Sequence, residues 1–298
     1  MFFRCQSVIM IETFINKFDG RNMKMLALIR ELLQQWKIDC FAPLPLSACT
    51  VKKPYLLERE GIRDGSVIII AVPYRTPLCD VPERNLSAYA VCKNYHAFFD
   101  ALYADVLPRL SAAYPEHRFA GFADHSPIAE VEAAAKAGLG VIGKNHLLLT
   151  EKYSSYIFLG ELVTDAALPC ELFPVRECEN CGACMRACPA SKLGTCLSAL
   201  TQKKGELNDA EKSAMLAYGS VWGCDICQDS CPHTLRAKAT QSIYTPIPYF
   251  YEDPVPVLTL DVLDQMSDEH FLTRAFSWRG KEVVRRNLAL FEKGDREC

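Results

Sequence analysis

The apolar residues of this chain change their spacing several times, and each spacing predicts a different element. From Met23 to Lys37 they recur three and four positions apart among good helix formers, which predicts a helix. Residues Ser66–Val72 form a short β-branched run between turn signals, which indicates a buried strand. Phe119–Ala123 and Tyr156–Val163 also predict strands, and Lys93–Tyr114 predicts a long helix.

Proline and glycine mark the expected ends of several elements. Pro108 is expected to kink or end the long helix, because proline lacks the amide hydrogen that a helix interior uses. Farther along, Ser126 can act as the N-cap of another helix, with Pro127 at its first position and Gly138 as its stop. A glycine-rich loop over Gly138–Asn145 follows that helix.

The order of these elements divides the chain into three parts. Strands and helices mix through residues 1–165, which argues for an α/β or α+β domain. Cysteine motifs dominate residues 166–240. A proline-rich stretch then leads into a short helical tail, residues 241–298, whose helical part is expected at about Asp261–Lys293.

The composition is that of a globular protein and shows no membrane span. Half of the 298 residues are apolar and 23% are charged, and no run of about 18 apolar residues could cross a bilayer. The N-terminal segment lacks the charged region, apolar stretch and cleavage site of a secretory signal, so a cytoplasmic location is expected. The formal net charge of −3 gives no overall attraction to nucleic acid, so RNA binding would need a local basic patch.

Cysteine supplies the strongest chemical signal. Seven of the fifteen cysteines form two groups that each end in Cys-Pro, with one cysteine standing between the groups. The first group is Cys178, Cys181, Cys184 and Cys188, the single cysteine is Cys196, and the second group is Cys224, Cys227 and Cys231. In the cytoplasm, clustered cysteines are more often metal ligands or redox groups than disulfides. Most of the remaining cysteines are interpreted as small buried apolar residues.

The first group has the spacing with which bacterial ferredoxins bind a [4Fe–4S] cluster. In two-cluster ferredoxins the cysteine before the proline binds the other cluster, so one cluster would take Cys178, Cys181, Cys184 and Cys231. The other would take Cys188, Cys224 and Cys227, with Cys196 as the natural fourth ligand. Structural zinc is the alternative, although the third cysteine in register and the terminal Cys-Pro favour iron–sulfur. The first domain is then expected to hold an electron acceptor.

Three segments and the two cysteine groups stand in a recognisable order along the chain. They are Asp124–Glu130, Ala137–Asn145, Phe158–Glu161 and the two cysteine groups, the second within Trp222–Gln228. Together they resemble the tRNA epoxyqueuosine reductase family, whose relatives include the corrinoid-dependent reductive dehalogenases. The resemblance runs from about Asp64 to Pro232, with a weaker match at Arg279–Leu290.

The resemblance implies an oxidoreductase with two kinds of cofactor. The first domain would bind a cobalamin with its base off, and the middle domain would be ferredoxin-like with two [4Fe–4S] clusters. Electrons would pass through the clusters to the cobalamin. The reaction would reduce the epoxide of epoxyqueuosine in a tRNA anticodon loop to the alkene of queuosine.

The resemblance gives Asp124 the role of proton donor, since the epoxide ring opens only if its oxygen gains a proton. An aspartate in water is ionised at neutral pH, so a donor needs a dry or buried site. The alternative is a capping carboxylate, because Asp124 comes just before a predicted helix N-terminus. His96 matches a Tyr-His pair of the family but is expected to be an ordinary helix histidine, and no lower axial ligand is nominated.

The resemblance also nominates contacts to the corrinoid. Backbone amides of the glycine-rich loop could bind a phosphate or the amides of the corrin. That loop is not a nucleotide-binding P-loop, because an asparagine follows its lysine where Ser or Thr would be required. Two further candidates adjoin cluster ligands, and one cysteine would face the cobalt. The candidates are Cys92, Lys144, Asn145, Ser198 and Asp225.

The sequence leaves the substrate and the partners open. Better-known family members continue into helical repeats that bind tRNA, whereas this sequence ends soon after the first helix of that region. Its basic residues fit a phosphate track or a solvated helix face equally well: Lys203, Lys204, Arg274, Arg279, Lys281, Arg285 and Arg286. An external protein such as ferredoxin or flavodoxin would supply electrons. Two alternatives are a corrinoid reductase of a small molecule and a non-catalytic iron–sulfur electron carrier.

Overall fold

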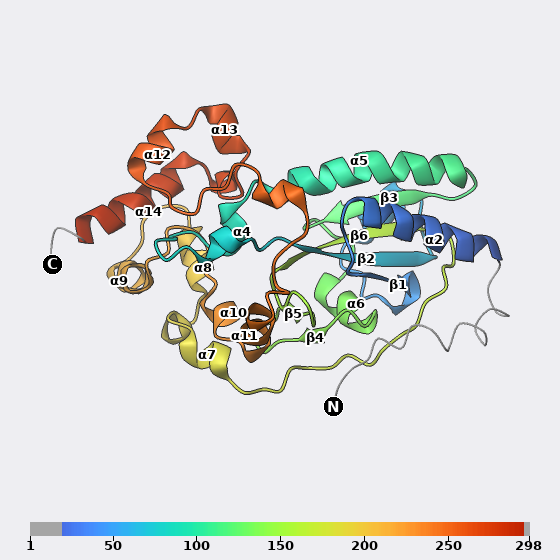
Figure 1. Ribbon diagram of the computed structural model, residues 1–298, viewed down its shortest axis with the longest axis horizontal. Coiled ribbons are helices and arrows are strands. Elements are labelled where there is room, and N and C mark those ends of the chain that lie inside the picture. The colour runs from blue at the N-terminus through green and yellow to red at the C-terminus, as the bar shows by residue number, and fades with distance from the viewer. Residues whose placement is uncertain (1–19, 295–298) are drawn as a thin grey trace.

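The computed structural model describes residues 20–294, and its central element is a four-stranded antiparallel sheet in the order β1-β2-β6-β3 (Figure 1). A separate two-stranded hairpin is formed by β4 and β5. The N-terminal segment considered above for a secretory signal lies outside the described residues, as do Cys5 and Cys298. The strands are β1 Phe41–Pro45, β2 Ser66–Pro73, β3 Phe119–Ala123, β4 Val141–Ile142, β5 Leu148–Leu149 and β6 Ile157–Thr164.

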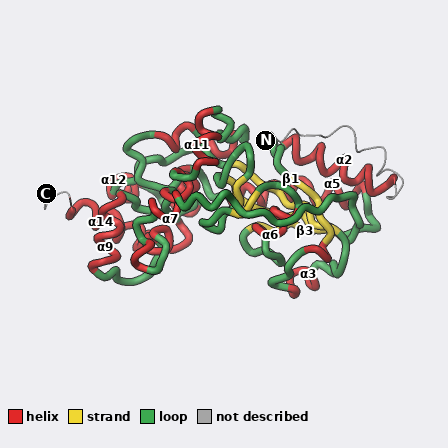
Figure 2. Tube along the Cα trace, turned by 90° about the horizontal axis from the view of Figure 1, so that it is seen from below, coloured by secondary structure: helices red, strands yellow, loops and turns green. Residues whose placement is uncertain are grey.

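Helices surround the sheet and make up most of the second half of the chain (Figure 2). The α-helices of the described residues are α2 Gly20–Gln35, α3 Pro54–Arg59, α4 Ala88–Val91, α5 Tyr95–Ala113, α6 Glu130–Lys136, α7 Ala183–Ala187, α8 Leu197–Thr201, α9 Asp209–Tyr218, α10 Ile226–Asp229, α11 Pro232–Ala239, α12 Leu260–Gln265, α13 Asp268–Leu272 and α14 Lys281–Gly294. Short 3₁₀ turns cover Leu46–Ala48, Pro77–Asp80, Ser191–Leu193, Pro248–Tyr251 and Ser277–Arg279.

The sheet separates two apolar layers, because successive residues of a strand point to opposite faces. Ile68 and Ile70 of β2 pack in the layer that contains α2 and α5. Val67 and Ile69 pack in the layer that contains α3 and α6. Every residue of β2 is buried, as expected of an unbroken β-branched run between two layers.

Helix α5 lies unusually close to the sheet because two glycines face it. A Cβ at Gly160 would lie 2.3 Å from the Phe99 ring, and one at Gly121 would lie 2.4 Å from the Tyr103 ring. No real side chain tolerates such distances, so these strand positions need glycine. The hydroxyl of Tyr103 donates a 2.7 Å hydrogen bond to the carbonyl oxygen of Phe122, which fixes the end of β3 against α5.

The cysteine-containing region leaves the main apolar core after Leu168 and rejoins it at Val221. Between those points the described residues form a small apolar cluster of their own: Ala190, Leu197, Leu200, Leu207 and Met215. The tail returns to the main core, where Phe250 and Phe276 are fully buried in the layer that contains α5. Figure 1 shows α14 beside α8 and α9, with α12 and α13 on the other side of α14 and all of them away from the sheet.

The structure confirms most of the predicted elements, with ends shifted by a few residues. The strands at 66–73, 119–123 and 157–164 and the helix at 20–35 are present. Pro108 lies inside α5 and does not end it. Buried Val106 and Leu110 flank this proline, and their packing outweighs the hydrogen bond that it removes.

One predicted helix start is wrong. Helix α6 begins at Glu130 with Ala129 as its N-cap, and Ser126 does not cap it. The segment before Glu130 is held extended instead, because the carbonyl oxygen of Pro127 accepts hydrogen bonds from Lys52 and Lys53. Gly138 does lie at the end of the helix, directly after the C-cap Ala137 and with a φ of 80°.

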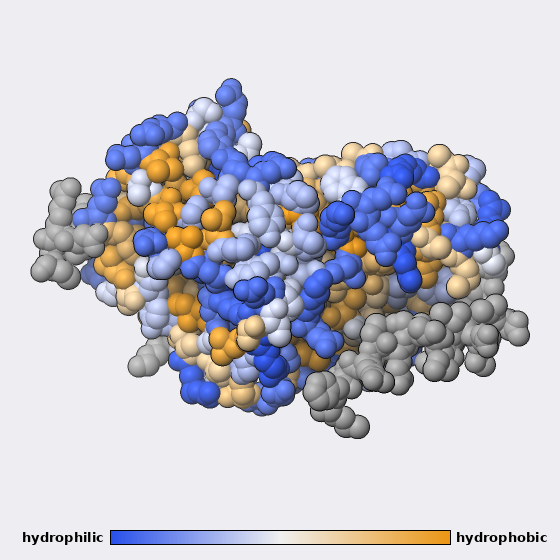
Figure 3. All heavy atoms as spheres, viewed as in Figure 1, coloured by the Kyte–Doolittle hydropathy of each residue, from blue (hydrophilic) through white to orange (hydrophobic). Residues whose placement is uncertain are grey.

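Within residues 20–294, no helix combines the length and the apolar character that crossing a membrane would require. Figure 3 shows hydrophilic side chains spread over one face of the molecule, with apolar patches between them. Exposed apolar side chains of the cysteine-containing region include Leu172, Phe173 and Met185.

Candidate functional site

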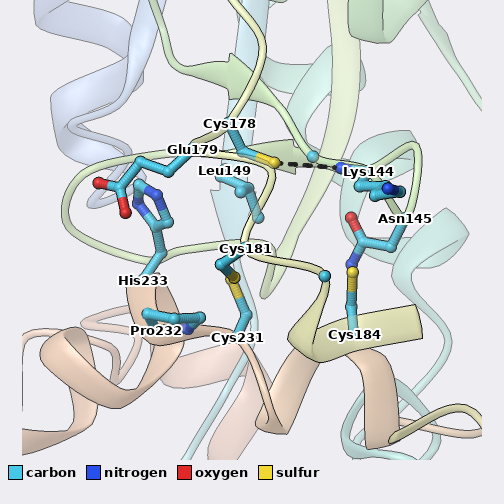
Figure 4. Close-up of a pocket in the computed structure, with 12 residues that line it drawn as sticks. Lys144, Asn145, Leu149, Cys178, Glu179, Cys181, Cys184, Cys231, Pro232 and His233 are labelled. Carbon is cyan, nitrogen blue, oxygen red and sulfur yellow. Dashed lines mark hydrogen bonds between the residues drawn. The ribbon is translucent and has the colours of Figure 1, made fainter. Parts of the chain in front are cut away.

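Four cysteines from two distant parts of the sequence line one cavity. Cys178, Cys181 and Cys184 come from the loop before α7 and from its first turn, and Cys231 precedes α11. The cavity has a volume of about 380 Å³ and is partly open to solvent (Figure 4). Cys181 is exposed, whereas Cys231 is buried. The structure therefore brings together the four residues predicted for the first cluster.

The local sequence explains how this loop turns its thiols toward one point. Asn180 and Gly182 both have left-handed backbone conformations, with φ angles of 51° and 73°. Asparagine and glycine adopt this conformation most readily, so the chain can curl between its cysteines at little cost. On the opposite side Pro232 occupies the first position of α11, where proline is favoured, and this fixes Cys231 at the helix entrance.

The β4–β5 hairpin closes the cavity and supplies hydrogen-bond donors to sulfur. The backbone N–H of Lys144 donates to Sγ of Cys178 at 3.3 Å, as Figure 4 shows. The side-chain amide of Asn145 lies 3.8 Å from Sγ of Cys227. Lys144 and Asn145, nominated above as corrinoid contacts, thus lie against the cysteines. Donors to sulfur are among the features that set the potential of an iron–sulfur cluster.

The second set of predicted ligands also gathers in one place. Cys188 and Cys224 pack against the same small apolar cluster. Burial raises the pKa of Cys224 to about 12, and the nearby Cys196 contributes to the shift. Burial likewise raises the pKa of Cys227 to about 11, with Cys196 and Cys188 among its neighbours.

At two of the eight positions the surroundings favour a neutral thiol unless a metal is bound. Two of the eight thiols, those of Cys224 and Cys227, have raised pKa values and are neutral at pH 7 without a nearby cation. A bound metal ion deprotonates a coordinating thiol outright and reverses that preference. Among residues 20–294, no three His, Cys, Asp or Glu side chains are placed to hold a single metal ion. Four of the predicted thiols line one cavity, which is the arrangement of ligands that a [4Fe–4S] cluster uses.

Asp124 occupies an exposed, left-handed position directly after β3. Its φ is 64° and its side chain is 66% exposed. Because α6 begins only at Glu130 and has Ala129 as its N-cap, Asp124 is not the capping carboxylate of that helix. Its Oδ2 lies 3.4 Å from Nε2 of His96, which comes from the first turn of α5.

A cleft of about 550 Å³, open to solvent, lies beside Asp124 between α5 and the end of β3. Phe99, Phe122 and the flanking histidines His96 and His125 line it. Both imidazoles have partners. Nδ1 of His96 lies 3.0 Å from Asn94 Oδ1, and His125 contacts Tyr55 and Lys53 at 2.9 and 3.1 Å.

The other nominated corrinoid contacts have internal partners. Cys92 is buried, its thiol donates to the carbonyl oxygen of Tyr89 at 3.3 Å, and burial raises its pKa to about 12. Asp225 is buried and accepts a 2.6 Å hydrogen bond from Arg84, so its carboxylate is already neutralised. Ser198 is half-buried and accepts a hydrogen bond from Gln202 at 3.0 Å.

Most of the basic residues singled out in the sequence are also paired internally. Arg274 is fully buried and donates to the carbonyl oxygen of Val91 at 2.8 Å, so it is not part of a surface track. Arg279 stacks on the exposed ring of Trp278 at 3.7 Å. The other pairs are Lys203 with Glu211, Lys281 with Asp268, Arg285 with Asp264, and Arg286 with the carbonyl oxygens of Lys203 and Gly205.

The sequence pattern assigns no role to Glu130 and Glu161, which meet behind the Asp124 loop. Glu161 lies opposite Phe122 in the β6–β3 ladder and is fully buried between the sheet and α6. The sequence does contain one signal for a special role of Glu161. A single acidic residue in an otherwise apolar strand indicates a partner or a bound proton, because a lone buried charge is very costly.

The chain is similar in sequence to known epoxyqueuosine reductases. It is 32% identical over 221 residues to the one from Gloeobacter violaceus, which corresponds to 71% of this chain and 69% of that protein. It is 30% identical over 261 residues to the one from Listeria monocytogenes, which corresponds to 80% of this chain and 65% of that protein. No family model matches the chain.

The fold is similar to those of solved epoxyqueuosine reductases. The structure from Streptococcus thermophilus superposes with a TM-score of 0.71 at 23% identity, over 91% of this chain and 80% of that one. An epoxyqueuosine reductase solved with an epoxyqueuosine-modified tRNA-Tyr stem loop gives the same TM-score over 90% of this chain and 81% of that one. The mixed arrangement of helices and strands is therefore shared along most of both chains.

Proposed function

Since this chain belongs to the epoxyqueuosine reductase family, a family of oxidoreductases, we propose that it reduces the epoxide of epoxyqueuosine in a tRNA anticodon loop to the alkene of queuosine. The observation that carries the proposal is the gathering of eight cysteines into two sets, one of them around a cavity, next to the sheet that bears Asp124. The reaction consumes two electrons and two protons and releases the epoxide oxygen as water.

Two sets of four thiolates would hold the clusters. The first set is Cys178, Cys181, Cys184 and Cys231, and the second is Cys188, Cys196, Cys224 and Cys227. When bound, the two [4Fe–4S] clusters and a cobalamin supply the electrons that the reduction needs. The N–H of Lys144 and the amide of Asn145 would act on the bound cluster through Cys178 and Cys227, because each directs a donor at sulfur. The cluster-binding region would be residues 166–240 and the corrinoid-binding domain residues 1–165.

Asp124 would donate the proton that the epoxide oxygen takes up. Its left-handed backbone directs the residue away from β3 and into solvent, where a bound substrate could contact it. His96 Nε2 lies 3.4 Å from the carboxylate and would hold it in place. A substrate that fills the adjoining cleft would exclude water, and a site without water favours the protonated form of a carboxyl group, which a general acid needs.

A second candidate is reduction of a small-molecule substrate at the same site. One observation favours it, because the basic residues that could follow a tRNA backbone are mostly engaged in internal pairs. The relative solved with a tRNA stem loop favours tRNA. An external electron-donor protein is needed in either case.

The deciding experiment uses anaerobically reconstituted protein loaded with iron, sulfide and cobalamin. A chemical reductant is added with either an epoxyqueuosine-containing tRNA stem loop or the free nucleoside, and the product is identified by mass spectrometry. We expect conversion of the stem loop, and conversion of the nucleoside alone would support the second candidate. Protein that binds iron but no cobalamin and converts neither would be an electron carrier.

Asp124→Asn tests the proton donor in the same assay. We expect turnover to fall at least about 100-fold, the usual contribution of a positioned general acid, with iron and cobalamin content unchanged. Asp209→Asn is the matched control, because this aspartate is fully exposed on α9 and pairs only with Lys212. Undiminished turnover in Asp124→Asn would remove this residue from the mechanism.

A further inference from the structure

Two carboxyl groups face each other in the interior behind the Asp124 loop. Glu161 on β6 is fully buried, and Glu130 at the start of α6 is half-buried. Neither oxygen of Glu161 has a hydrogen-bond partner, and Oε1 of Glu130 has none either. The nearby hydroxyl of Ser126 lies 3.1 Å from the carbonyl oxygen of Ile128, and its interaction with Glu161 lowers the pKa of that residue by less than burial raises it.

This arrangement requires a bound proton. Two carboxylates without a donor between them would repel each other in a medium of low dielectric constant, whereas a carboxylic acid can donate to its neighbour. Burial raises the pKa of Glu161 well above its usual range, and Glu130 adds to the shift. Burial also raises the pKa of Glu130 to about 7, with Asp124 among the causes.

The positive charge of Lys53 does not offset the burial of the pair. It lowers the pKa of both glutamates, but burial is the larger effect, and its ammonium lies 3.1 Å from Nδ1 of His125. The remaining titratable groups that face the pair carry no positive charge: Asp124, Cys49, Tyr95 and Tyr103. The proton is therefore the means by which the protein keeps both carboxyl groups inside.

The pair leads from the interior to Asp124. Glu161 lies opposite Phe122, two residues before Asp124 in the chain. Glu130 lies next to Glu161, and the backbone N–H of Asp124 is directed at the Glu130 carboxyl group. The three acidic residues thus form a line in which burial decreases from Glu161 through Glu130 to Asp124.

We propose that Glu130 and Glu161 share a proton-holding site that returns a proton to Asp124 after each turnover. The proposal rests on the proposed function, in which Asp124 gives its proton to the substrate oxygen. In the return step the O–H bond of Glu130 breaks and a new O–H bond forms on the Asp124 carboxylate, with no electron transferred. A hydronium ion from solvent then gives its proton to the Glu130 carboxylate, which restores the one proton that Glu130 and Glu161 share.

Infrared spectroscopy tests the shared proton without any reaction. At pH 7 the cluster-loaded protein should show the C=O stretch of a neutral carboxyl group, which is well separated from carboxylate bands. The band should be lost in Glu161→Gln and unchanged in Glu132→Gln, a control on α6 whose carboxylate is exposed and bonded to Thr50 and Lys136. If wild-type protein lacks the band at pH 7, or if Glu161→Gln retains it, the shared proton does not exist.

Kinetics then test the return step. In Glu130→Gln we expect the steady-state rate to fall about tenfold more than the rate of the first turnover, because only later turnovers need a returned proton. A small carboxylic acid in the buffer should restore the steady-state rate, whereas a purely structural defect would not respond. Equal losses in both phases, no rescue, or wild-type rates in both phases would overturn the proposal.

The two proposals can fail separately. If Asp124→Asn keeps full turnover, the assignment of the proton donor fails whatever the infrared result. If Asp124→Asn is inactive while Glu130→Gln behaves as wild type, the donor stands and the return step through Glu130 is refuted. Glu130→Asp, which keeps an acid one methylene shorter, should recover part of the steady-state rate.

Discussion

The buried carboxyl pair predicts an unusual dependence of stability on pH. A glutamate that keeps its proton in the folded state, while the same residue ionises in the unfolded chain, favours the unfolded state as pH rises. The pKa of Glu130 rises from about 4.5 to about 7 on folding, and that of Glu161 rises further. The pair therefore makes its full contribution to the free energy of unfolding below about pH 4.5, and this contribution decreases as the pH rises through about 7.

The magnitude follows from the number of protons retained. For each proton that the folded protein keeps and the unfolded chain releases, the free energy of unfolding falls by about 1.36 kcal/mol for every unit that the pH rises. If the pair keeps one proton that the unfolded chain releases, raising the pH from 5.5 to 7.0 costs about 2 kcal/mol. Glu161→Gln removes one titrating group and gives Glu130 an N–H donor, so the variant should escape this loss.

Urea denaturation at pH 5.5 and pH 7.0, followed by circular dichroism, measures the effect in cluster-loaded protein under anaerobic conditions. The free energy of unfolding of Glu161→Gln relative to wild type should increase by about 2 kcal/mol between the two pH values. Glu132→Gln should change by much less, because its carboxylate is exposed and paired with Lys136. If the free energies of unfolding of Glu161→Gln and wild type change by the same amount between the two pH values, the pair does not hold a proton.

Three further changes test other contacts. Asp225→Ala leaves the guanidinium of Arg84 without its 2.6 Å partner, so the free energy of unfolding in urea should fall by about 3–5 kcal/mol, and a fall below about 1 kcal/mol would contradict a buried ion pair. Gly143→Ala places a Cβ 2.3 Å from Oδ1 of Asn145, and the displaced amide should change the electron paramagnetic resonance spectrum of the reduced clusters without loss of iron. Asn287→Ala breaks hydrogen bonds to two backbone carbonyls at 2.7 and 2.8 Å, which should cost about 1–3 kcal/mol in the same denaturation assay.

The sequence predicts three of the four strands of the sheet and misses β1, one of its two edge strands. Strands β2, β3 and β6 are found because each is an apolar run bounded by turn residues. Strand β1 escapes prediction because Pro43 and Pro45 interrupt its pattern. It is an edge strand that pairs only with β2, and proline is tolerated at an edge, where its missing N–H needs no partner.

Some features of the candidate site can be predicted from local sequence, and others depend on how distant segments pack together. The cysteine spacing predicts which thiols share a site, because ligand spacing is a property of local sequence. The roles of Lys144 and Asn145 beside the thiols depend on how the β4–β5 hairpin packs against the 176–178 segment, which no local pattern reveals. The Glu130–Glu161 pair likewise depends on the register between β6 and β3 and on the delayed start of α6.

The path of the chain through the main core has a consequence for how the cofactors are acquired. The chain leaves that core after Leu168 and rejoins it at Val221, so both ends of this excursion are anchored independently of iron. The excursion itself has only the small apolar cluster that includes Leu200 and Met215. The sheet and tail can therefore fold first, and the excursion can remain open to iron delivery. Cluster assembly would then be the last step of maturation, and it would order the cysteine-containing segment between Leu168 and Val221.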